Sequence, residues 1–234
     1  LCGAEWLGTV SRQIENDLSG RKGNIMEKLW KRLETQMVQS YEGMVKEDSD
    51  MTVWNRAFET LAEIVEYGRK KYGDFAPELF ILDGSTDFMF DLKVWLDDYM
   101  EFLEQEEEQE QLEKVCRKLL KLFAWEKASP SDIRFRLASS MLSLNKKKEA
   151  GDFCERWYGE DENDPAAAAA LIYAWIADRR YKDAQKVVDF WMDKEGGYTE
   201  ENAEVFGAAA VLQNVFPGNG KDIQVQYRSS CNKL

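Results

Sequence analysis

Part of the second half of this chain repeats itself at a spacing of 34 residues. Three features return in the second copy: Leu137 as Leu171, Trp157 as Trp191, and Lys148-Glu149-Ala150 as Lys182-Asp183-Ala184. A period in this range is typical of stacked helical hairpins, which bury their apolar faces only by packing on their neighbours. The repeat therefore predicts stacked antiparallel helical hairpins, and it favours binding as the activity without naming a partner.

The placement of proline extends the helical prediction to the whole chain. Only four prolines occur, each where the apolar pattern pauses: Pro77, Pro130, Pro165 and Pro217. A proline inside a helix costs about 3 kcal/mol, so prolines confined to boundaries favour helices between them. Apolar residues recur at helical spacing before the repeat, in residues 4–18, 24–46, 51–72, 87–106 and 112–123. We expect an all-α fold of about ten helices.

Helix caps and turn residues suggest three parts of the chain. Residues 1–84 form an N-terminal helical region, and residues 85–217 form the hairpins. Residues 218–234, called the tail below, form an extended or flexible segment. The expected N-caps are Ser49 or Asp50, Ser85 or Thr86, Ser131 or Asp132, Asp164 before Pro165, and Thr199.

The segments 132–157 and 166–191 resemble tetratricopeptide repeats. The matching large and small apolar positions are Leu137-Ala138 with Ala150, and Leu171 with Ala174 and Ala184; the run 180–184 is the closest local match. Two residues depart from the pattern, since Ile172 replaces a small residue and Lys147 replaces an aromatic one. The resemblance implies a superhelical stack whose first helices line a concave binding surface. An ordinary helical bundle stays an open alternative.

Composition excludes several classes of function. The chain has no histidine, which rules out Ser-His-Asp and Cys-His catalysis and the H-E-x-x-H zinc site. A net charge of −13 disfavours binding to nucleic acid or to an anionic membrane, and no apolar run is long enough to span a membrane. The four cysteines form no C-x-x-C pair, which favours the cytoplasm. The start lacks both methionine and a signal pattern, so we expect a trimmed chain and leave a removed signal peptide open.

Aromatic residues on the first helix of the better repeat are the candidate binding residues. Most of the eight tryptophans fall on apolar helical faces and are expected in the core. If the tetratricopeptide resemblance holds, the groove would be lined by Tyr173, Trp175 and Asp178, with Arg134, Met141 and Asn145 from the preceding hairpin.

Charged segments give weaker candidates. The acidic stretch 101–113 is interpreted as a solvated helix face, and pairs such as Asp97-Asp98 or Asp161 and Asp164 as caps and surface charge. We therefore predict no catalytic residue, no metal site and no cofactor. Residues 221–234 of the tail are basic and alternate apolar with polar residues, so we expect them to dock as an extended segment on the acidic helical body of the same chain or of a neighbour.

The predicted function is a non-catalytic interaction module that binds a protein or peptide segment, including a basic one, in a helical groove. Two alternatives stay open: a ligand- or peptide-sensing domain of a larger protein, and a histidine-free enzyme or glycan binder that uses carboxylates and tryptophans. The sequence leaves the partner, the biological process and the oligomeric state undetermined.

Overall fold

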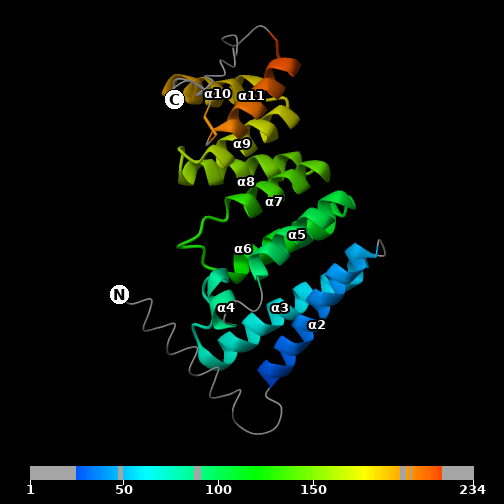
Figure 1. Cartoon of the computed structure of the whole chain (residues 1–234). Coiled ribbons are helices and arrows are strands. Elements are labelled where there is room, and N and C mark those ends of the chain that lie inside the picture. The colour runs from blue at the N-terminus through cyan, green and yellow to red at the C-terminus, as the bar shows by residue number, and fades with distance from the viewer. Residues whose placement is uncertain (1–24, 47–49, 87–90, 196–198, 201, 218–234) are drawn as a thin grey trace, which may run out of the picture. The chain divides into compact units, whose positions relative to one another are not determined.

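The computed structural model describes residues 25–46, 50–86, 91–195, 199–200 and 202–217. In this part of the chain the fold is all-α, with ten helices and no strand (Figure 1). The helices are α2 (Ile25–Val45), α3 (Met51–Tyr72), α4 (Leu79–Ser85), α5 (Leu92–Gln105), α6 (Gln109–Leu122), α7 (Ser131–Ser143), α8 (Lys147–Glu160), α9 (Pro165–Ala177), α10 (Tyr181–Glu195) and α11 (Ala203–Val215). The helix expected at residues 4–18 and the tail lie outside the described residues.

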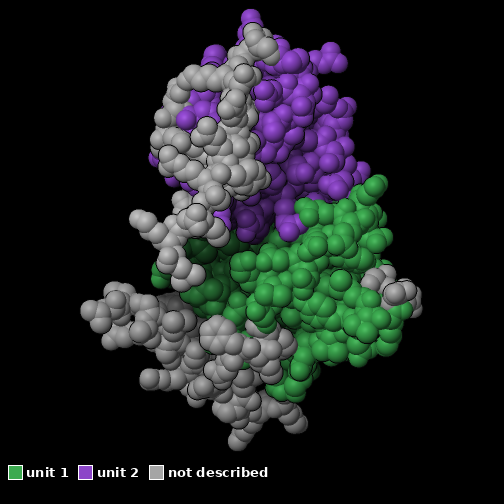
Figure 2. Space-filling model, turned by 45° about the horizontal axis from the view of Figure 1, so that its top comes forward, with its two compact units in different colours: residues 1–108, 118–129 green, residues 109–117, 130–234 purple. Residues whose placement is uncertain are grey.

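The chain divides into two compact units (Figure 2). Unit 1 comprises residues 1–108 and 118–129, and unit 2 comprises residues 109–117 and 130–234. Helix α6 contributes its first nine residues to unit 2 and its last turn to unit 1. The predicted boundary between residues 84 and 85 falls inside α4, within unit 1.

Unit 1 is built around an aromatic core. The side chain of Trp54 on α3 is fully buried, and its ring stacks on those of Trp95 and Tyr99 from α5 at centroid distances of 5.5 and 5.9 Å. The polar tips of these rings bond to neighbouring helices: the Trp95 indole donates to Ser40 Oγ at 3.1 Å, and the Tyr99 hydroxyl donates to Asn55 Oδ1. These two bonds tie α5 to α2 and α3, whereas the Trp54 indole nitrogen has no hydrogen-bond partner among the described residues.

The end of α3 shows a close backbone approach. A Cβ at Gly68 would lie 2.1 Å from the Phe75 ring, so only glycine leaves room for this buried side chain. The helix then ends at Gly73, whose φ of +74° suits a residue without a Cβ. Arg69 donates to the carbonyl oxygens of Phe75, Ala76 and Leu122, which ties the following loop to the last turn of α6.

Unit 2 is organised around a helix of small residues. Helix α9 contacts α7, α8, α10 and α11. Its buried residues are Ala167, Ala168, Ala169, Ala170, Leu171, Ile172 and Ala174. Alanine lets a neighbouring backbone approach closely, and one helix can then pack against four others.

The sequence repeat corresponds to a repeat in backbone geometry. Asn145 ends the turn after α7 with a φ of +59°, and Arg179 does the same after α9 with a φ of +61°. In both turns the next residue donates across five positions, Lys146 N to Met141 O at 2.8 Å and Arg180 N to Trp175 O at 2.7 Å. These bonds define a Schellman motif at each site. The two helix pairs α7–α8 and α9–α10 are therefore closed in the same way.

Several predicted caps hold and others were wrong. Asp50 and Asp164 accept from backbone amides at the starts of α3 and α9, as expected. The first described helix after residue 86 is capped by Asp91, not by Ser85 or Thr86. Helix α7 is preceded by Pro130 and α11 by Asn202, not by the predicted Ser131 or Asp132 and Thr199. The Thr199 hydroxyl instead bonds to the amide of Asn202, one turn outside the helix.

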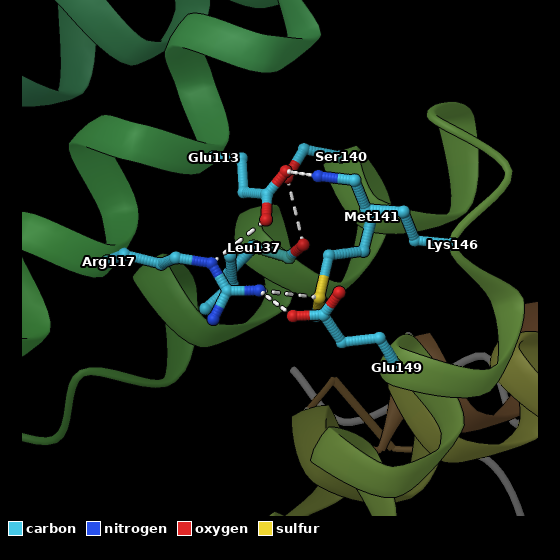
Figure 3. Close-up of polar contacts among 7 residues, drawn as sticks. All are labelled: Glu113, Arg117, Leu137, Ser140, Met141, Lys146 and Glu149. Carbon is cyan, nitrogen blue, oxygen red and sulfur yellow. Dashed lines mark hydrogen bonds and ion pairs between the residues drawn. The ribbon is translucent and has the colours of Figure 1, made fainter.

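Charged side chains link α6 to the α7–α8 pair inside unit 2 (Figure 3). The Glu113 carboxylate is only 8% exposed and accepts from Lys146 Nζ at 2.6 Å and from Arg117 Nε at 2.9 Å. Arg117 also donates to Glu149 on α8 and to the Met141 sulfur. Burial alone would raise the pKa of Glu113, but the bonds from Lys146 and Arg117 outweigh it and lower the pKa. The network thus stabilises the charged form of Glu113.

Candidate functional site

A groove of about 430 Å³ lies between α7 and α9 in unit 2. It is lined by Phe135, Ala138, Ser139 and Leu142 from α7, and by Ala170, Tyr173, Ile176 and Ala177 from α9. The α7 residues recur at three- and four-residue spacing, so they share one face of that helix. The volume is in the range typical of pockets that hold small molecules or a few side chains of a peptide.

The groove has an apolar floor and a partly open rim. Ala138 and Ala170 are each 2% exposed and form the bottom, while the larger side chains of Phe135, Leu142 and Tyr173 remain only half-buried. Small residues at the bottom leave the space, and half-exposed large ones supply apolar surface that a ligand can cover. Burial of that surface would contribute roughly 25 cal/mol for each Å².

Tyr173 connects three helices of unit 2. Its ring meets the Phe135 ring of α7 edge to face at 6.4 Å. Its hydroxyl lies 3.7 Å from where a Cβ at Gly207 of α11 would stand, which is ordinary van der Waals contact, so the phenol lies against α11. Burial raises the pKa of Tyr173, and the nearby charge of Glu204 raises it further. The phenol therefore stays protonated and can donate a hydrogen bond.

Carboxylates stand at the beginnings of α7, α9 and α11, near enough for the charges of Asp132 and Asp164 to act on Glu204. Desolvation raises the pKa of Glu204, and the charges of Asp132 and Asp164 raise it further. Ser131 Oγ also donates to Asp164 Oδ2 at 3.1 Å, so α7 and α9 begin side by side. We call Asp132, Asp164 and Glu204 the acidic flank. It gives one end of the groove region a negative potential that favours a cationic group.

Only one of the six sequence-predicted groove residues lines the groove. That residue is Tyr173. The Trp175 indole instead donates to Glu155 of α8 at 2.9 Å, and the Arg180 guanidinium covers its ring at 4.6 Å. Asp178 is the exposed C-cap of α9. Tyr173 and Trp175 are two residues apart, so they project about 200° apart around α9 and meet different neighbours.

The three residues expected from the preceding hairpin also lie elsewhere. Arg134 pairs with Glu160 at 2.6 Å and lies over the Trp157 ring. Met141 is fully buried, and Asn145 adopts the positive φ of the turn after α7. The groove thus lies between the two helices that were expected to form it, but most of its lining residues are not the predicted ones.

A sequence signal for the remaining lining residues does exist. Phe135, Ala138, Ser139 and Leu142 follow the i, i+3, i+4, i+7 pattern of one helix face. The tetratricopeptide resemblance placed Ala138 in contacts within the hairpin, and the other three residues were not among the predicted groove residues. It favoured polar and large aromatic residues, whereas the groove is made mainly of small and aliphatic ones.

The described residues offer no metal centre, since no group of three or more cysteine, aspartate or glutamate side chains among them is placed to hold a cation. In the same part of the chain, no helix combines the length and the apolar composition needed to cross a bilayer.

The structure and the sequence were compared with known proteins. Searches against protein-family models, against curated proteins and against solved structures give no match for this chain. The groove between α7 and α9 is therefore interpreted from its own geometry and chemistry.

Proposed function

We propose that unit 2 is a non-catalytic interaction module that binds a peptide segment of a partner protein in the groove between α7 and α9. The observation that carries this proposal is the groove itself, with its apolar floor of alanines beside an acidic flank. The partner segment would present one or two aliphatic or aromatic side chains, followed by a lysine or an arginine.

The apolar part of the partner is argued from the lining. Seven of the eight lining residues are aliphatic or aromatic, and Ser139 is the exposed exception. Apolar anchors that fill a pocket usually supply most of the binding free energy in such interfaces. A hydrogen bond from the protonated Tyr173 hydroxyl would add orientation, since a peptide carbonyl can accept it.

The basic part of the partner is argued from charge. The acidic flank stands where α7, α9 and α11 begin, and the whole chain carries a net charge of −13. A cationic side chain placed there relieves repulsion among the three carboxylates. Such a contact accelerates association and is weakened by salt, because the Debye length falls to about 8 Å at physiological ionic strength.

The resemblance to tetratricopeptide repeats adds support from the arrangement of helices. In that family first helices line the binding surface, and α7 and α9 are the first helices of the two matched segments. The identical Schellman turns at Asn145 and Arg179 keep the two pairs in equivalent geometry. The membership itself stays part of this proposal.

The test is a titration of the full chain with a panel of fluorescent twelve-residue peptides. Each peptide carries a Leu-x-Tyr or Phe-x-Leu anchor, flanked on one side by lysines, by glutamates or by serines. We expect lysine-flanked peptides to bind at least tenfold more tightly than glutamate-flanked ones, and we expect their affinity to fall as salt rises.

Two matched variants locate the site. Ser139→Arg places a bulky cation in the groove, whereas Ser143→Arg places it one turn further along α7, outside the lining. Binding should fall at least tenfold in Ser139→Arg and change less than twofold in Ser143→Arg. An equal loss of peptide binding in both variants would contradict the proposal. Equal affinity for the lysine-, glutamate- and serine-flanked peptides would contradict it as well.

A further inference from the structure

We infer that the groove between α7 and α9 is occupied by the chain's own tail, through residues 221–234 of the same molecule. This inference rests on the proposed function, because it treats the groove as a peptide site. It adds the identity of a ligand and a means of regulation, since a tethered tail competes with a partner.

The described part of the chain ends beside one end of the groove. Phe216 closes α11 by donating its amide to Leu212 O at 2.8 Å, and its ring stacks on Tyr181 at 5.3 Å. Tyr181 begins α10, directly after the turn that follows Ile176 and Ala177 of the groove. Phe216, near the end of the described residues, therefore lies close to the C-terminal end of α9.

The tail has the composition that the proposed site requires. Ile223, Val225 and Tyr227 alternate with Gln224 and Gln226, so one side of an extended segment is apolar. Its basic residues are Lys221, Arg228 and Lys233, and its only acidic side chain is Asp222. The tail is thus positive where the body of the chain is strongly negative.

The order of features along the tail matches their order along the groove. From the C-terminal end of α9, a segment first crosses the apolar lining and then reaches the acidic flank at the helix beginnings. The span from Ile223 to Arg228 is about 17 Å when extended. A helix of 13 residues such as α9 is about 20 Å long. The apolar residues can therefore lie in the groove while Arg228 reaches the carboxylates.

Tethering makes a weak contact effective. A short flexible connection gives an effective concentration on the order of 1 mM. If the tail binds its own groove with a dissociation constant of roughly 100 µM, the groove is closed in about nine molecules of ten. A partner peptide would then bind about tenfold more weakly than it binds an open groove.

The experiment measures the affinity of one lysine-flanked probe peptide for three full-length proteins. The first is the wild-type chain, the second carries Ile223→Ser, Val225→Ser and Tyr227→Ser, and the third carries the control substitutions Gln224→Ser and Gln226→Ser. We expect the triple variant to bind the probe about tenfold more tightly than wild type, and the control to match wild type within twofold. Equal affinities in all three proteins would overturn the inference.

A second readout separates this inference from the proposed function. Hydrogen exchange of residues 221–234 should accelerate when Ser139→Arg blocks the groove, and it should not change with Ser143→Arg. If the probe binds in a Ser139-dependent way but the tail exchange is unaltered, the tail inference fails and the proposed function stands. If no probe binds even to the triple variant, the proposed function fails as well. If protection of residues 221–234 from exchange increases with protein concentration, the tail binds a second copy of the chain. That result would overturn the assignment to the same molecule.

Discussion

The two units of this protein solve the packing of helices in opposite ways. In unit 1 large rings fill the space between helices, with Trp54, Trp95 and Tyr99 all fully buried. In unit 2 the central helix α9 buries alanines instead, and four helices approach it closely. The stacked rings of Trp54, Trp95 and Tyr99 occupy the space between α3 and α5. Alanines leave space that larger side chains would fill, and Ala138 and Ala170 form the floor of the groove between α7 and α9.

The two units also differ in the polar interactions that hold their helices together. Unit 1 holds its rings with neutral hydrogen bonds, such as that from Trp95 to Ser40. Unit 2 holds α6 to the α7–α8 pair with the ion pairs of Glu113. Neutral bonds of this kind do not titrate in acid, whereas the ion pairs of Glu113 are lost when the pH falls far enough to protonate its carboxylate. The comparison therefore predicts that the two units respond differently to changes in core volume and in pH.

The largest effect is expected from Trp54→Ala in unit 1. Removal of a fully buried indole leaves a cavity and should lower the free energy of unfolding by about 3–5 kcal/mol. Urea unfolding gives the total, and hydrogen exchange shows whether unit 1 alone loses protection. The Trp54 indole nitrogen has no hydrogen-bond partner among the described residues, so Trp54→Phe should cost much less. A loss below about 1 kcal/mol in Trp54→Ala would show that the rings are not the main stabilisers.

A smaller effect with the opposite change in volume is expected in unit 2. Ala174 is fully buried on α9, so Ala174→Leu overfills the contact and should cost about 1–3 kcal/mol. The matched control is Ala177→Leu on the same helix, where the added side chain enters the groove and stability should change by less than about 0.5 kcal/mol. Thermal unfolding of both variants is the measurement. Equal stability of the two variants would mean that α9 does not depend on close approach.

The smallest effect is expected from Glu113→Gln, and it should depend on pH. The pKa of Glu113 is lower in the folded state than its usual value of about 4.3. A lowered pKa stabilises the fold above the unfolded pKa, and this stabilisation is lost as pH falls through the folded pKa. The substitution should therefore cost about 1–2 kcal/mol at pH 7. The cost should shrink as the pH falls below the unfolded pKa and Glu113 becomes protonated in the folded state as well.

The control for this substitution is Glu110→Gln, an exposed residue in the first turn of the same helix. It should change stability by less than about 0.5 kcal/mol at either pH. Denaturant unfolding at pH 7 and pH 3 gives the comparison. A cost for Glu113→Gln that stays constant over this range would mean that the charge of Glu113 contributes nothing.

Much of the helical architecture was predictable from local pattern. The bounds of α3 and the start of α9 follow from Asp50, Gly73 and Asp164, whose preferences act through the nearest backbone groups. The caps of α5 and α11 were wrong because Ser, Thr, Asp and Asn cluster before both helices. Several residues in each cluster satisfy the same local rule, and only the packed structure selects one.

The site was less predictable than the fold. The repeat correctly indicated helices 131–143 and 165–177, yet the groove is lined by Phe135 and Ile176 rather than by Trp175 or Met141. A residue lines a groove only if its helix is rotated to face the gap. That rotation depends on contacts with α8, α10 and α11, which lie at other positions in the chain.

The sequence by itself determined the all-helical class, most helix bounds and the 34-residue recurrence of the turns at Asn145 and Arg179. These features depend on interactions within one helical turn or one hairpin, so a local pattern specifies them. The tertiary structure alone decided which faces of α7 and α9 diverge, where Asp132, Asp164 and Glu204 meet, and which aromatics stay accessible. Those features depend on the volumes and charges of side chains from several helices that are distant in sequence. The residue pattern within one helix therefore does not specify them.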